Sequence, residues 1–132
     1  MAKYRVVFLE EASEHLEEMS RALLELERDP KHREAIDLVF RMAHSIKGMA
    51  ASLGYDSISE VAHRLEDRMQ GVRTAGCMEA DDLALLFKGL EGLEAMVAVV
   101  SDTGDAPPAD PGLVHALAAP VAPLKKKALS PR

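Results

Sequence analysis

The sequence has few of the residues that build disulfide-linked, aromatic-rich or membrane-spanning proteins. Tryptophan is absent, aromatic residues make up 4% of the 132 residues, and Cys77 is the single cysteine, so an internal disulfide is excluded. The longest purely apolar runs, such as residues 95–100, are far too short to cross a bilayer. No charged-then-apolar leader opens the chain. We therefore expect a soluble, cytoplasmic protein without membrane insertion.

A basic surface and a phosphate cradle are also missing. The net charge of −6 argues against a protein that binds nucleic acid, which would need a basic face. There is no Gly-x-x-x-x-Gly-Lys-Ser/Thr loop and no other glycine-rich cradle with acidic metal ligands beside it. We therefore expect no cofactor in this chain and no autonomous ATPase or kinase activity.

The chain does have apolar residues at helical spacing. Four segments carry such a stripe: about residues 4–27, 33–53, 57 to the 71–76 region, and 81–100. The clearest stripe is in the last segment and contains Leu83, Leu86, Leu90, Leu93, Val97 and Val100. Each segment would bury one face and expose the other. The sequence predicts an all-α fold, an antiparallel up-down four-helix bundle over residues 1–100.

Local signals predict where these helices begin and end. Pro30 should end the first helix, because proline disfavours the helical conformation of the residue before it. Ser57 and Glu60 have the spacing of a capping box, which would open the third helix. Asp81 or Asp82 is the expected N-cap of the fourth.

Composition changes after residue 100. Six of the seven prolines lie there, and residues 101–132 read as a linker and tail, in which Lys125–Lys127 form a basic run that we interpret as solvated. A short amphipathic helix at about residues 111–119, containing Leu113 and Leu117, would dock on the bundle or remain part of the linker. Both alternatives stay open.

One histidine stands out on the second predicted helix. At 100° per residue, the apolar residues of this helix fall in one continuous arc, and His44 lies roughly opposite its centre. Lys47 and Gly48 follow it by three and four residues and share its face. An exposed imidazole therefore has a cation on one side and a bare backbone on the other.

Two motifs resemble a known family. The first is Phe40-Arg-Met-Ala-His44-Ser-Ile-Lys47-Gly48, and the second is Ile58-Ser-Glu-Val-Ala-His63-Arg-Leu-Glu66. Together they resemble the histidine phosphotransfer (HPt) domain of CheA-type chemotaxis histidine kinases, a phosphocarrier of two-component signalling. The resemblance covers about residues 4–100. It implies that ATP and Mg²⁺ are bound by a separate kinase domain, further along the same polypeptide, and that an aspartate of a response regulator receiver takes the phosphoryl group.

The resemblance also implies roles for five residues. His44 would be the phosphoacceptor, and Glu66 would accept a hydrogen bond from its Nδ1, which leaves Nε2 as the nucleophile. Lys47 would balance phosphoryl charge, Gly48 would leave room for partner proteins, and His63 would support the hydrogen-bond network.

Two other function classes remain open. Glu60 and His63 match one Glu-x-x-His element of a di-iron four-helix bundle, but that architecture needs two such elements and further inward carboxylates. A helical adaptor without phosphotransfer is the second alternative. The presence of His44, Lys47, Gly48 and Glu66 together favours phosphotransfer over both.

The remaining histidines and two arginines have ordinary interpretations. We expect His15, His32 and His115 to be solvated or packed, and Arg41 and Arg64 to be surface charges with some chance of contacting a receiver. The four apolar stripes are accounted for by one internal core, so we expect this chain to be a monomer.

Overall fold

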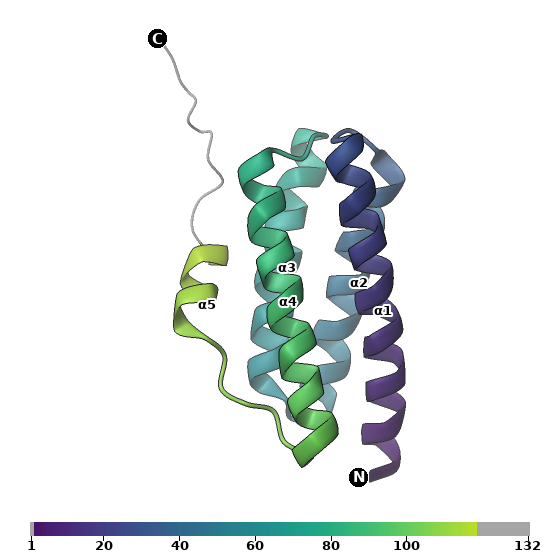
Figure 1. Cartoon of the computed structure of the whole chain (residues 1–132), viewed down its shortest axis with the longest axis vertical. Coiled ribbons are helices and arrows are strands. Elements are labelled where there is room, and N and C mark those ends of the chain that lie inside the picture. Colours follow the sequence, from purple (N-terminus) through teal and green to yellow (C-terminus); the bar gives the residue numbers. More distant parts are fainter. Residues whose placement is uncertain (1, 119–132) are drawn as a thin grey trace.

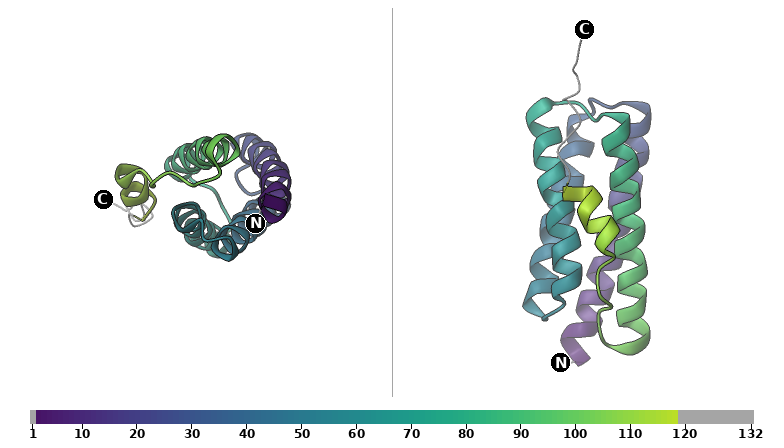
Figure 2. Two further views of the ribbon diagram at one scale, coloured as in Figure 1. Left: turned by 90° about the horizontal axis from the view of Figure 1, so that it is seen from below. Right: turned by 90° about the vertical axis from the view of Figure 1, so that its left-hand side faces the viewer.

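The structure is a computed structural model that describes residues 2–118, which form five helices. They are α1 (Ala2–Arg28), α2 (Arg33–Ser52), α3 (Asp56–Ala75), α4 (Ala80–Thr103) and α5 (Pro111–Ala118). The first four run antiparallel to their neighbours in the chain and surround one core, and α5 lies outside this ring (Figures 1 and 2). The predicted all-α four-helix bundle is confirmed, and α5 is the short fifth helix that the sequence left open.

The core is where the four apolar stripes meet. Every residue of the α3 stripe is buried: Ile58, Val61, Ala62, Leu65, Met69 and Val72. In α4 the predicted seam is buried from Leu86 to Val100, whereas Leu83 is only half-buried at its start. Each helix buries one stripe and exposes the opposite face, which is mostly polar except for Tyr4, Val6, Val7 and Leu24 on α1. No helix in residues 2–118 is long and apolar enough to cross a membrane.

Two helix ends follow the sequence signals. α1 stops at Arg28, directly before Asp29 and Pro30, as the effect of proline on its preceding residue predicts. α3 ends at Ala75 and is followed by Gly76, which has φ of 77° and adopts the left-handed conformation without the strain that a Cβ would add.

Both predicted N-caps are wrong. α3 begins at Asp56 with Tyr55 as its N-cap residue, so Ser57 lies inside the first turn, and its hydroxyl donates to the Pro107 carbonyl at 2.6 Å. α4 begins at Ala80 after Glu79, and neither N-cap side chain makes a capping hydrogen bond. Asp82 lies in the first turn of α4 and is buried. In both helices, the side chain that the local pattern assigned to a cap, Ser57 or Asp82, instead contacts a segment distant in the sequence.

Arg68 of α3 is the reason that Asp82 is buried. Both side chains are buried and form an ion pair between α3 and α4. The guanidinium also donates to the last carbonyls of α5: Nε and Nη2 lie 3.2 and 3.1 Å from the Leu117 oxygen, and Nη2 lies 3.4 Å from that of Ala116. These carbonyls have no partner within α5. One arginine therefore joins α3, α4 and α5, and Leu117 packs into the core beside it.

The run Lys125–Lys127 lies outside the described residues.

We predict that Arg68→Met lowers the free energy of unfolding by about 3–5 kcal/mol, because it leaves the Asp82 carboxylate buried without its partner. Urea unfolding followed by circular dichroism measures this change. The control is Arg28→Met, because Arg28 pairs with Glu25 on the surface of one helix, and its loss should cost less than about 1 kcal/mol. Equal, small effects of the two substitutions would contradict the structural role of the buried pair.

Candidate functional site

His44 projects from the outer face of α2. The buried residues of this helix are Ala35, Ile36, Val39, Ala43, Ile46 and Ala50, which lie on its inner face. Because His44 lies on the opposite face, its side chain is 63% exposed. The apolar pattern of α2 therefore fixes which way the imidazole points, as predicted.

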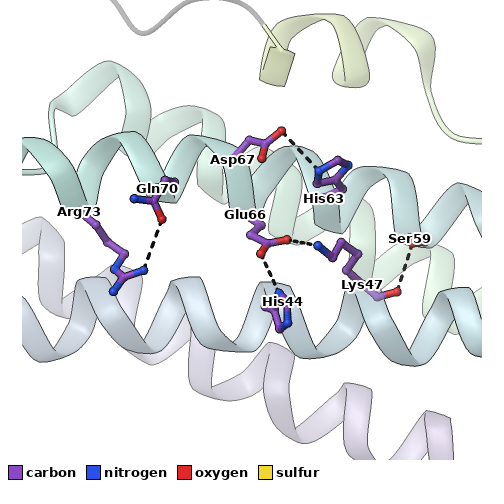
Figure 3. A network of polar contacts seen from close by, with 8 residues as sticks. All are labelled: His44, Lys47, Ser59, His63, Glu66, Asp67, Gln70 and Arg73. Atoms are coloured by element: carbon purple, nitrogen blue, oxygen red, sulfur yellow. Dashed lines mark hydrogen bonds and ion pairs between the residues drawn. The ribbon is translucent and has the colours of Figure 1, made fainter.

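Glu66 of α3 brings the site together. Its side chain is only 12% exposed, and its carboxylate lies between two residues of α2 (Figure 3). Oε2 is 2.7 Å from Nδ1 of His44, and Oε1 is 2.6 Å from Nζ of Lys47. The predicted contact between Glu66 and His44 is present, and it involves the predicted nitrogen. Lys47 belongs to the same cluster, but it contacts the carboxylate directly.

The cluster determines the charge of Glu66. Desolvation raises the pKa of this carboxyl group, but the contacts with Lys47 and then with His44 outweigh it. The net result is a pKa below the ordinary value of a glutamate. Glu66 is therefore a carboxylate at neutral pH, and a carboxylate can only accept hydrogen bonds.

The surface beside His44 is open. A Cβ built on Gly48 would meet no atom within 4 Å, so the glycine leaves free space one turn from the imidazole. This is the arrangement that the sequence predicted for close approach of another protein.

His63 lies apart from this cluster. Its Nε2 is 3.6 Å from a carboxylate oxygen of Asp67, and the side chain is 52% exposed. In the described part of the chain, no contact connects it to His44, Lys47 or Glu66 (Figure 3). The participation of His63 in the network therefore stays a prediction, because in this conformation His63 contacts none of the three residues.

Glu60 and His63, the residues of the metal-binding alternative, also lie outside the cluster around Glu66. Glu60 is exposed, and a carboxylate oxygen lies 3.9 Å from the Arg64 guanidinium one turn away. Within residues 2–118, no group of three histidine, cysteine or acidic side chains is placed to hold a metal ion. The described region therefore gives the di-iron interpretation no site.

Sequence reasoning missed several side-chain contacts of α2, the helix that carries His44. Ser59 of α3 donates from Oγ to the main-chain oxygen of Lys47 at 3.1 Å. His15 of α1 is half-buried, and its Nε2 lies 3.1 Å from Oγ of Ser45, the residue after His44. His32 caps α2, since its Nδ1 accepts from the backbone N–H of Ala35. Single side chains of this kind carry no periodic signal, so a hydrophobic pattern alone could not find them.

Comparison with known proteins identifies the family. The Hpt domain family matches residues 3–103. The chemotaxis protein CheA of Bacillus subtilis is 40% identical over 93 residues, and that of Halobacterium salinarum is 36% identical over 92. Each match covers 69% of this chain and 14% of the relative, so the chain spans only a small part of these proteins.

Solved structures show the same fold. The phosphorylated P1 domain of CheA3 from R. sphaeroides, solved in complex with CheY6, superposes with a TM-score of 0.82 over 89% of this chain and 94% of that one, at 23% identity. The CheA phosphotransferase domain from Thermotoga maritima gives 0.70 over 75% and 95%, at 33% identity. A solution structure of the histidine phosphotransfer domain of CheA gives 0.76 over 89% and 90%, at 30% identity. The match of the family to most of the chain, and of its fold to the whole bundle, shows that this chain belongs to the Hpt domain family.

Proposed function

We propose that this chain is a phosphoacceptor and phosphocarrier of a chemotaxis-like two-component system, with His44 as the acceptor. The observation that carries the proposal is the 2.7 Å contact between Nδ1 of His44 and the Glu66 carboxylate, on an imidazole that is otherwise exposed. The relatives that are named as CheA proteins, and the similar phosphotransfer domain from Thermotoga maritima, support it.

The contact selects the tautomer of His44. Glu66 is ionised and can only accept, so Nδ1 must be the donor and carries the proton. In the neutral imidazole, Nε2 then keeps its lone pair. Glu66 thus orients the ring and stabilises the positive charge that develops when Nε2 forms a bond, in the same way that a carboxylate assists histidine in a catalytic triad.

The proposed reaction has two transfers. In the first, Nε2 of His44 attacks the γ-phosphorus of ATP held by a separate kinase domain, the N–P bond forms, and the P–O bond to ADP breaks with its electron pair on ADP. In the second, a carboxylate oxygen of a receiver aspartate attacks the same phosphorus, and the electrons of the N–P bond return to Nε2. The chain itself begins and ends this cycle unchanged.

Lys47 would have two anionic partners during this cycle. In the free protein its ammonium group pairs with Oε1 of Glu66. Once His44 carries a phosphoryl group, one turn away, the same ammonium has a second and more highly charged anion within reach of its flexible side chain. We assign Lys47 to stabilising that phosphoryl group, and Gly48 to leaving the approach open for both partner proteins.

The partners and location follow from the same proposal. The relatives are several times longer than this chain, so we place the ATP-binding and Mg²⁺-binding kinase domain on the same longer polypeptide. The receiver is a separate protein or domain. Such a relay operates in the cytoplasm.

The first prediction of the proposed function concerns the acceptor. When the chain is incubated with γ-labelled ATP and a CheA-type kinase lacking its own phosphotransfer domain, we expect acid-labile, base-stable label on wild type and none on His44→Gln. His115→Gln is the control histidine, since it lies on α5 and should label normally. Unlabelled wild type, with its helical fold intact and an active cognate kinase, would instead support the adaptor alternative.

The second prediction separates Glu66 from Lys47. We expect Glu66→Gln to lower the rate of phosphoryl uptake by about 100-fold or more, since an amide no longer holds the tautomer or the developing charge. Lys47→Met should lower uptake and also shorten the lifetime of phosphorylated His44. Single-turnover labelling with excess kinase measures uptake, and the decay of the label after kinase and ATP are removed measures the lifetime. A Glu66→Gln variant that labels at the wild-type rate would remove Glu66 from the mechanism.

The third prediction concerns pH. The folded state lowers the pKa of Glu66, so its contribution to stability is present above the unfolded pKa, near 4, and is lost as the pH falls through the folded value. The difference in unfolding free energy between wild type and Glu66→Gln should therefore shrink from pH 7 toward pH 3. Glu14→Gln, at an exposed position of α1, should show no such trend. A constant difference for Glu66→Gln would contradict the shift.

A further inference from the structure

The face of α3 that meets α2 carries three polar contacts spaced seven residues apart. Ser59, Glu66 and Arg73 each contact α2 through their side chains. Seven residues are almost two full helical turns, so the three lie in one line along α3. The pair that contains His44 is the middle one, with a further polar contact two turns away on either side.

The first flanking contact acts on Lys47. Oγ of the half-buried Ser59 donates to the main-chain oxygen of Lys47 at 3.1 Å, and Nζ of Lys47 lies 2.6 Å from Glu66 (Figure 3). Ser59 therefore fixes the backbone of a residue whose side chain holds the carboxylate. This contact sets the axial position of α3 against α2 at one end of the site.

The second flanking contact is centred on Arg73. Nε of Arg73 lies 3.2 Å from a carboxylate oxygen of Asp37, and its guanidinium lies over the ring of Phe40, 4.3 Å from the centroid. Arg33 donates to the Arg73 carbonyl at 3.3 Å. Asp37 stands seven residues before His44 on α2, just as Arg73 stands seven residues after Glu66 on α3, so this contact lies two turns from the His44 pair on both helices. The other end of the site is thereby tied through three residues of α2.

Apolar packing and polar contacts constrain this register in different ways. The buried stripe of α3 is made of aliphatic side chains, and the free energy of burying them does not depend on the direction of any one contact. A hydrogen bond of 2.7 Å weakens steeply when its atoms move by a similar amount. Directional contacts at defined positions can supply the missing precision, as buried polar groups do when they set the register of coiled coils.

We propose that Ser59 and Arg73 are positioning residues that hold the axial register of α3 on α2 and thereby keep the Glu66 carboxylate on Nδ1 of His44. Neither residue touches the phosphoryl group. They act through Glu66 and Lys47, and their effect on phosphotransfer rests on the function proposed above. Their effect on the His44 ring does not depend on that function.

The test combines a ring measurement with a rate measurement. ¹⁵N chemical shifts of the His44 imidazole report the fraction of Nδ1–H tautomer in the unphosphorylated chain, and single-turnover labelling reports uptake. We expect Ser59→Ala and Arg73→Met each to lower the Nδ1–H fraction and to slow uptake by about three- to tenfold, and the double variant by about 100-fold, which is the effect of a displacement of about 1 Å. Circular dichroism and urea unfolding establish that each variant is folded.

Conservative and control variants separate positioning from general stability. Ser59→Thr keeps the hydroxyl and should recover most of the wild-type ring signature. Arg73→Lys keeps the charge that faces Asp37 but not the planar group over Phe40, so it should recover only part of that signature. Arg28→Met removes an exposed ion pair inside α1 and should change neither readout. A loss of stability alone would leave the shifts of the folded molecules unchanged.

The outcomes are distinct for the two proposals. A folded double variant with the wild-type tautomer fraction and uptake rate would overturn the positioning role. The ring shifts could respond as expected in the variants while the wild-type chain takes up no phosphoryl group from an active kinase. That result would support the positioning role and reject the proposed function. A tautomer fraction that changes equally in Arg28→Met would also reject the positioning role.

Discussion

The Glu66 carboxylate, shared between His44 and Lys47, is the contact on which the site depends. It lies 2.7 Å from an imidazole nitrogen and 2.6 Å from an ammonium, and it comes from a different helix than either. An ionised acceptor in this position gives the imidazole one defined tautomer. The bundle therefore brings one carboxylate of α3 to two nitrogens of α2, and its apolar core supplies the rigid support that such contacts need.

The fold could be predicted from the sequence because it follows from repeated features. Four stripes of apolar residues predict four helices, and Pro30 marks a boundary by a local steric rule. The orientation of His44 follows from the same periodicity, because the side opposite a buried arc must face solvent. Its contact with Glu66 was implied by family resemblance, since periodicity places Glu66 on the edge of a stripe without naming its partner.

What could not be predicted depends on contacts between distant segments. Ser57 and Asp82 both fit local capping rules, yet Pro107 and Arg68 take their side chains. A capping rule considers only a few neighbouring residues, whereas these partners lie on elements that meet only after folding. His63 shows the opposite case: the resemblance assigned it to the network, and in this conformation its nearest charged partner is Asp67 on its own helix.

The position of Arg68 beneath α5 has a consequence for how the domain opens. If α5 detached while the other helices stayed in place, the buried guanidinium of Arg68 would lose the carbonyl oxygens of Ala116 and Leu117. The side chain of Leu117 would also leave an apolar gap. Removing α5 is therefore costly unless α3 and α4 separate as well. We therefore expect the amides of residues 111–118 to exchange with the same cooperative unit as the four long helices, even though the family match ends at residue 103.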